Sequence, residues 1–159
     1  MKRGMKKNWK VLAVSLLIVY IVAFAGSFFT SKNANTSWYS SVRNSLTPPN
    51  FVFMIMWNVL FFLIALSLYF AWIKSKKKQK IKISWVFGIN FLLNIIWCIL
   101  FFGIKKTNLA FFELIVLWLS ILLMIFITWG INKKSAWLLV PYALWVGFAG
   151  ILNYLIAFG

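Results

Sequence analysis

Two amides and an indole recur at helical spacing inside an apolar stretch near the middle of the chain. Asn90, Asn94, Trp97 and Phe101 are separated by three or four residues, so a helix over this stretch turns all four side chains to one face. Amides donate and accept hydrogen bonds, and aromatic rings offer flat apolar faces. The stripe indicates a surface that faces something other than lipid, either a ligand or a neighbouring helix.

The remaining inventory of reactive side chains is nearly empty, which excludes most catalytic chemistry. The chain has no histidine, one cysteine (Cys98) and one acid (Glu113). No carboxylate pair, nucleophilic triad or histidine-rich metal site can be assembled from these residues. The sequence therefore predicts no metal site and no obligatory cofactor.

Composition sets the class of protein that must position these groups. Hydrophobic residues make up 64% of the chain and the mean hydropathy is +0.91, which is incompatible with an ordinary soluble surface. The 159 residues leave room for one domain of several spans, so we treat residues 1–159 as a single membrane domain. The sequence predicts an all-α integral membrane protein.

Five apolar runs are long enough to cross a hydrocarbon core at about 20 residues per span. We place these runs at 11–29, 51–73, 84–103, 108–131 and 136–158. The short connections that follow the third and fourth runs force neighbouring helices to be antiparallel, so the expected fold is a compact bundle of five transmembrane helices. Only the outer connection, 30–50, is long enough to form a lid over a pocket.

The charge pattern indicates membrane topology rather than nucleic-acid binding. All seventeen cations lie in the amino-terminal tail or in the connections, and the net charge is +16. Thirteen of them fall in the tail, in the 74–83 connection and at 133–134, and four fall on the opposite side. Because positive residues concentrate on the cytoplasmic side of a cell membrane, we predict a cytoplasmic amino terminus and an external carboxyl terminus. Membrane lipids, not nucleic acid, are the expected partners of these cations.

A cleavable signal peptide is the alternative interpretation of the first apolar run. The Ala-Phe-Ala sequence at 23–25 resembles a processing site after a basic start. The apolar character continues past it, through Phe28 and Phe29, so the run is longer than that of a typical signal peptide. We therefore expect the first run to be retained as a transmembrane helix.

Three predicted spans bring aromatic and amide groups to overlapping depths. Trp57 and Trp97 each lie six residues inside the outer end of their span, which puts both about 9 Å below the outer surface. Trp145, Ala149 and Asn153 form an i, i+4, i+8 stripe on the fifth span. The shared depth favours a pocket beneath the outer connection, with interhelical amide hydrogen bonds as the open alternative.

Motifs in the outer connection and in later spans resemble one known family. The connection reads W-Y-S-S-V-R-N-S-L-T-P-P over 38–49, which is similar to the loop of the TspO/MBR family, also called the tryptophan-rich sensory protein, translocator protein or peripheral benzodiazepine receptor family. The N-I-I-W sequence at 94–97 and the P-Y-A-L-W sequence at 141–145 match as well. The chain departs from the family loop at Asn44 and Leu46, where proline and a second tryptophan are usual.

The resemblance implies a five-helix receptor or sensor, often a homodimer, whose pocket binds porphyrins such as protoporphyrin IX and benzodiazepine-like or isoquinoline-like ligands. The porphyrin would be a ligand and not an obligatory cofactor. Some members degrade protoporphyrin under light, which implies a photochemical role for Trp57 and Trp145. Carried over by position, the ligand-binding residues are Trp38, Tyr39, Trp57, Asn94, Trp97, Cys98, Trp145 and Ala149.

Charged residues near the outer ends of the spans leave two further alternatives open. Lys32, Arg43, Lys105 and Lys106 could attract the propionates of a porphyrin or lipid headgroups. Glu113 lies inside the fourth span, close to the last two of these lysines. Because an ionisable residue within a membrane marks a functional candidate, the alternative function is a small-molecule or tetrapyrrole transporter coupled to protons through Glu113. The plainer interpretation is an interfacial ion pair of Glu113 with Lys105 or Lys106.

Overall fold

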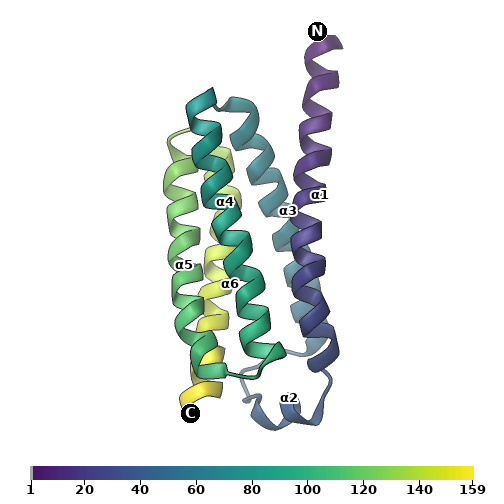
Figure 1. Ribbon diagram of the computed structural model, residues 1–159, viewed down its shortest axis with the longest axis vertical. Coiled ribbons are helices and arrows are strands. Elements are labelled where there is room, and N and C mark those ends of the chain that lie inside the picture. The colour runs from purple at the N-terminus through teal and green to yellow at the C-terminus, as the bar shows by residue number, and fades with distance from the viewer. Residues whose placement is uncertain (1) are drawn as a thin grey trace.

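Long helices account for nearly the whole chain in the computed structural model, which describes the backbone of residues 2–159 and the side chains of residues 8–159 (Figure 1). In chain order the elements are α1 (Lys2–Asn33), α2 (Ser37–Val42), α3 (Asn50–Lys74), α4 (Lys77–Cys98), the π-helical turn η1 (Ile99–Gly103), α5 (Thr107–Trp129) and α6 (Lys133–Phe158). Five helical segments are long and apolar enough to cross a membrane, with η1 continuing α4. The predicted class, an all-α integral membrane protein with five transmembrane helices, is confirmed.

The two ends of the bundle differ in chemistry. The amino terminus and the α3–α4 turn lie at one end, whereas α2 and the carboxyl terminus lie at the other (Figure 1). We call the first the lysine end, because it carries the lysines of 74–82 and 133–134, and the second the lid end.

The helices pack against one another in a defined order. α5 packs against α4 and α6, and α6 also packs against α3. α1 lies at the side of the bundle and packs mainly on α3, so it is the least enclosed of the long helices.

α1 and α4 extend furthest beyond the apolar runs that predict them. α4 begins at Lys77, so the expected 74–83 connection shrinks to two residues. Lysine and glutamine are good helix formers, and the Gln79 side chain accepts a hydrogen bond from the Lys76 backbone N–H at 2.8 Å, which stabilises the first turn. α1 also runs past the predicted end of its span, and the lid connection, 34–49, contains α2.

Small residues on α6 let α5 approach it closely. A Cβ on Gly150 would stand 3.0 Å from Leu114 Cδ2 of α5, closer than ordinary contact. The Trp118 indole N–H donates to the Ala143 carbonyl of α6 at 2.9 Å. Small residues favour close helix contacts both within a chain and between chains. In this protein the small residues of α6 serve a contact within the chain.

The last turn of α4 is wound as a π-helix. The Ile104 N–H donates to the Ile99 carbonyl at 2.8 Å, and Lys105 follows with a φ of 58°. The wider turn leaves both Phe101 and Phe102 buried, in a small apolar cluster beneath α2. Single π-helical turns of this kind occur frequently at functional sites. The regular 3.6-residue period assumed from the sequence does not predict this turn.

Candidate functional site

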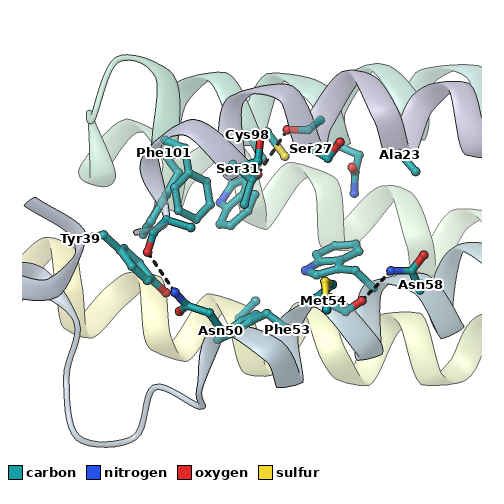
Figure 2. Close-up of a pocket in the computed structure, with 18 of the residues that line it drawn as sticks. Ala23, Ser27, Ser31, Tyr39, Asn50, Phe53, Met54, Asn58, Cys98 and Phe101 are labelled. Atoms are coloured by element: carbon teal, nitrogen blue, oxygen red, sulfur yellow. Dashed lines mark hydrogen bonds between the residues drawn. The ribbon is translucent and has the colours of Figure 1, made fainter. Parts of the chain in front are cut away.

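A cavity of about 620 Å³ lies at the lid end, between α1, α3, α4 and α6 (Figure 2). Its size falls within roughly 300–1,000 Å³, the range of small-molecule sites. The lining is mostly apolar and aromatic, with a few amides and hydroxyls. Six of the eight predicted ligand-binding residues line the cavity, namely Tyr39, Trp57, Asn94, Trp97, Cys98 and Ala149.

The other two predicted residues, Trp38 and Trp145, are not among the residues that line the cavity. Trp38 packs from α2 against Phe101, with 6.1 Å between the ring centroids, and Lys105 Nζ lies 5.2 Å from the Trp38 ring. Trp145 packs against Phe53, with 5.6 Å between centroids, and its indole N–H is buried without a partner among the described side chains. Phe53 therefore presents the ring to the cavity where Trp145 was expected.

α1 supplies a wall of the cavity that the sequence analysis missed. Ala23, Gly26 and Thr30 line the cavity, and their spacing of three or four residues puts them on one face of the helix; Ala34, just past the end of α1, lines it as well. This run of small residues is the signal that could have identified the wall. A Cβ on Gly26 would lie 3.2 Å from Cys98 Sγ, so glycine lets α1 come close to α4 at this level.

The lid helix α2 closes one end of the cavity through aromatic packing. The buried Tyr39 ring lies 5.6 Å from the Phe102 ring of η1. The Arg43 guanidinium donates to the backbone carbonyls of Thr47 at 3.3 Å and Pro48 at 3.2 Å, which holds the loop that leads into α3. Burial raises the pKa of the Tyr39 hydroxyl, and the positive charge of Arg43 partly offsets this rise. Arg43 is therefore committed to the structure of the lid.

The cavity is tied together at the lid end and open on one flank. Asn50 Nδ2 of α3 donates to the Ala34 carbonyl of the chain leaving α1, at 3.1 Å. Farther from the lid, Phe24 of α1 and Met54 of α3 line the cavity although they are 76% and 63% exposed. Asn58 lies on the same flank and donates to the Met54 carbonyl of its own helix at 2.8 Å (Figure 2). The opening lies between α1 and α3, on a surface that a bilayer would cover.

Buried amides and hydroxyls join α4, α5 and α6 behind the cavity wall. Asn94 Nδ2 donates to the Tyr142 hydroxyl at 3.2 Å, and this hydroxyl donates to Asn90 Oδ1 at 3.2 Å. Asn90 Nδ2 then donates to Ser120 Oγ at 2.8 Å, and Ser120 donates to the Leu117 carbonyl at 2.6 Å. Asn90 thus links helices, whereas Asn94 both bonds to α6 and lines the cavity.

The Trp97 indole is fixed in its position on the cavity wall. Its N–H donates to Asn153 Oδ1 of α6 at 3.1 Å, and Asn153 Nδ2 donates to the Thr107 carbonyl at the start of α5 at 2.8 Å. The Trp97 ring also stacks on Phe101 at 5.1 Å between centroids, with 25° between the ring planes. One amide therefore joins three helices and holds an aromatic face toward the cavity.

Glu113 is a half-buried residue whose carboxylate group lies out of contact with solvent. Neither carboxylate oxygen is exposed or has a hydrogen-bond partner among the side chains that the structure describes. The ion pair expected with Lys105 or Lys106 is therefore absent from the described residues. The chain turns sharply at Lys105, and the ammonium group of that lysine lies over the Trp38 ring. Glu113 is not part of the cavity lining.

Five membrane-spanning helices around one lidded aromatic cavity define the class of the protein, a small integral membrane protein with an internal cavity of ligand size. Comparison with known sequences narrows this class. The chain belongs to the TspO/MBR family, whose family model matches residues 14–158. It is a membrane protein of the sensor and translocator type.

Relatives from distant organisms match along nearly the whole chain. The tryptophan-rich protein TspO of Archaeoglobus fulgidus is 36% identical over 146 residues, which cover 91% of this chain and 94% of the relative. The protein of the same name from Chlorobaculum tepidum is 33% identical over 153 residues, 96% and 97% of the two chains. The translocator protein of Bos taurus is 24% identical over 153 residues, 94% and 90% of the two chains. The matches therefore extend over the lid connection as well as the helices.

Proposed function

We propose that the protein binds planar, largely apolar molecules, with porphyrins such as protoporphyrin IX as the principal class, in the cavity beneath α2. The observation that carries this proposal is an aromatic cavity of about 620 Å³ beneath the lid. The Trp57 and Trp97 rings offer faces for stacking on a macrocycle. Benzodiazepine-like and isoquinoline-like ligands would use the same aromatic walls.

Cations at the lid end support an anionic periphery on the ligand. Lys32, Lys105 and Lys106 lie in the segments that surround the lid, and they have no ion pair with an acid among the described residues. Lys32 and Lys105 lie over aromatic rings, 3.8 Å from the Phe28 centroid and 5.2 Å from the Trp38 centroid. Such contacts leave an ammonium group able to attract a carboxylate. Propionates near the lid and a macrocycle among the indoles would satisfy both parts of the site.

Titration with protoporphyrin IX in detergent micelles tests the proposal, with the shift of the porphyrin absorption band as the readout. Replacing Trp57 or Trp97 by leucine should weaken binding about tenfold, because each change removes a stacking face and buried aromatic area. Trp137→Leu is the matched control, since that indole is exposed at the lysine end. Absence of a saturable shift in the unaltered protein would overturn the proposal.

We further propose that the bound porphyrin is oxidised by dioxygen under light, with Trp57 and Trp145 as the participating indoles. Trp57 lines the cavity, whereas Trp145 lies behind Phe53. Loss of porphyrin absorption under illumination should therefore slow more in Trp57→Phe than in Trp145→Phe. Equal bleaching with and without the protein would exclude a role for the chain.

The proposed orientation puts the lysine end in the cytoplasm and the lid end outside, and anionic lipid headgroups are the proposed partners of the lysines. In a Cys98→Ser background, Ser40→Cys in the lid should react with an impermeant maleimide on intact cells, while Lys78→Cys at the lysine end should not. The reverse labelling pattern would invert the proposed topology.

A homodimer is also proposed, by family analogy alone, and light scattering of the purified protein tests it.

A second candidate function is proton-coupled transport of a small molecule or tetrapyrrole, and the burial of Glu113 favours it. Both carboxylate oxygens are buried without a partner among the described side chains, and an ionised carboxylate in such a place is costly. A group of this kind can bind and release a proton as its surroundings change. Uptake into liposomes driven by a pH gradient should be lost in Glu113→Gln. Unchanged uptake would remove Glu113 from the coupling mechanism.

A further inference from the structure

Pro141 interrupts the backbone hydrogen bonding of α6 near the lysine end. It lies inside the helix, and proline has no N–H, so the Trp137 carbonyl four residues earlier lacks its usual helical donor. Two polar side chains near this end of the bundle are bonded to other carbonyls. Asn132 Nδ2 donates to the Phe70 carbonyl, and Ser135 Oγ donates to the Ser67 carbonyl. Because an unpartnered carbonyl is costly within a bilayer, a donor from outside the chain would stabilise this one.

The Trp137 carbonyl lies on a face of α6 that is open to the membrane. Lys133, Trp137 and Pro141 are spaced by four residues, which puts them on one face of the helix, and all three are exposed. The Trp137 ring packs against the Trp129 ring of α5, with 5.8 Å between the ring centroids. Exposed tryptophans are typical of the headgroup region of a bilayer. The carbonyl, about 6 Å along α6 from its first residue, is therefore at headgroup depth.

A cation lies at the same level. Lys133 Nζ is 5.7 Å from the Trp129 centroid, so its ammonium group stays beside the ring pair, and Lys134 is exposed next to it. The only acid of the chain, Glu113, precedes Trp129 on α5 by about 24 Å of helix, and the carboxyl terminus lies at the lid end (Figure 1). The counter-ions of the two lysines must therefore come from outside the chain.

We infer that this face of α6 binds one anionic phospholipid whose headgroup carries a hydroxyl, with phosphatidylglycerol as the class. Lys133, with Lys134 beside it, holds the phosphate, and the Trp137 carbonyl accepts a hydrogen bond from the headgroup hydroxyl. Charge complementarity selects an anionic lipid, and the acceptor left by Pro141 distinguishes a hydroxylated headgroup from a plain one. The inference rests on the proposed partnership of the lysines with anionic headgroups, and it adds a location and a headgroup chemistry.

The α3–α4 turn carries more lysines but lacks the acceptor. Lys80 Nζ lies 5.3 Å from the Trp72 centroid, so a cation and an indole are in a similar relation there. Neither α3 nor α4 contains a proline inside the helix, so their interior carbonyls keep their helical donors. This turn should attract anionic lipids whatever their headgroup, and it therefore provides an internal control.

Native mass spectrometry of the full chain in detergent tests the inference, by titration with three lipids of identical acyl chains. These lipids are phosphatidylglycerol, phosphatidylmethanol and phosphatidylcholine. Phosphatidylmethanol carries the same phosphate charge as phosphatidylglycerol but has no headgroup hydroxyl. The unaltered protein should bind phosphatidylglycerol about threefold to tenfold more tightly than phosphatidylmethanol, the range for one neutral hydrogen bond. Both anionic lipids should bind more tightly than phosphatidylcholine.

Single replacements separate the two parts of the site. Pro141→Ala restores an N–H for the Trp137 carbonyl, so the ratio of the two anionic affinities should fall to about one while both lipids still bind. Leu144→Ala is the matched control at an exposed position of the same helix, and it should keep the ratio. Lys133→Gln should weaken both anionic lipids about fivefold. Lys77→Gln, at the exposed start of α4, should leave the ratio unchanged.

Each other result has a defined meaning. Equal affinities for the two anionic lipids in the unaltered protein would overturn the inference and leave the proposed lipid partnership standing. A preference that survives Pro141→Ala, or anionic affinities unchanged by Lys133→Gln, would place the headgroup elsewhere and also overturn it. If phosphatidylcholine binds as tightly as both anionic lipids, the proposed partnership of the lysines fails as well. Pro141→Leu restores the same N–H and decides the matter if Pro141→Ala does not fold.

Discussion

Gly26 of α1 faces Cys98 of α4 so closely that a Cβ at residue 26 would stand 3.2 Å from the cysteine Sγ. The same Cβ would stand 3.9 Å from Asn94 Oδ1. The absence of a side chain at this one position therefore sets how near the least enclosed helix comes to the polar wall of the cavity.

Gly26→Leu should wedge α1 away from α4 or fill part of the cavity. Overpacking of this kind costs about 1–3 kcal/mol, so we expect protoporphyrin affinity to fall about tenfold. Gly26→Ala should have a smaller effect, because the sulfur has to move by only a few tenths of an ångström. Absorption titration measures both. Gly88→Leu is the control, since a Cβ there meets nothing within 4 Å, and equal affinities for Gly26→Leu and Gly88→Leu would contradict the prediction.

Ionisation of the Tyr39 hydroxyl at alkaline pH should destabilise the closed lid. Burial raises the pKa of its hydroxyl above the ordinary value of 10.0, so the closed lid favours the neutral phenol. A pKa raised in the folded state adds stability that is complete below the unfolded pKa and is lost as the pH rises through the folded pKa. Release of bound protoporphyrin should therefore accelerate above about pH 10. Tyr39→Phe should remove this acceleration and Tyr154→Phe should keep it, and identical pH profiles for all three proteins would refute the link.

Replacing Asn153 should lower the stability of the folded protein more than the loss of one hydrogen bond would, because its amide bonds two groups. Asn153→Leu leaves both the Trp97 N–H and the Thr107 carbonyl without partners, at a cost of about 1–3 kcal/mol. Thermal unfolding in micelles measures the loss, with Asn108→Leu at an exposed position as the control. In a Trp97→Phe background the cost of Asn153→Leu should shrink, because one of the two orphaned groups is already gone. Strict additivity of the two changes would argue against the shared hydrogen bond.

Gly150 should be sensitive to any added side chain. A Cβ there stands 3.0 Å from Leu114 Cδ2, so Gly150→Val should overpack the α5–α6 contact and destabilise the bundle by about 1–3 kcal/mol. Leu114→Ala removes the obstructing methyl groups and should restore part of the lost stability to the double variant. Denaturation midpoints of the four proteins form a double-mutant cycle. A coupling energy near zero would show that the two side chains do not meet.

Ligands should reach the cavity through its open flank, because exposed Phe24 and Met54 line the cavity where lipid would cover it. In a Cys98→Ser background, Met54→Cys should react with a lipid-soluble maleimide, and bound protoporphyrin should slow that reaction. Phe126→Cys is the control, since Phe126 is 78% exposed on α5, outside the cavity lining. Equal protection of both cysteines by the porphyrin would indicate a non-specific effect on the membrane.

The sequence predicts much of the candidate site, because the position of a residue along its span gives its depth in the membrane. The predicted levels of Trp57, Trp97 and Ala149 follow from counting residues inward from span ends, and all three side chains line the cavity. Depth does not determine rotation about the helix axis. Trp145 is therefore predicted by depth, yet Phe53 takes its place at the cavity surface because packing between α3 and α6 sets the rotation.

The sequence by itself determined the membrane class, the five spans and the absence of conventional catalytic groups, because hydropathy and residue inventory act over whole segments. Only the tertiary structure decided how single groups are used. It shows the carboxylate oxygens of Glu113 buried without the expected lysine partner, Arg43 bonded to backbone carbonyls, and a π-helical turn beneath the lid. It also shows Asn94, part of the stripe first seen in the sequence, held by its nitrogen so that its oxygen faces the cavity. The physical reason is that a hydrogen bond depends on distance and direction between residues far apart in sequence, which no local period records.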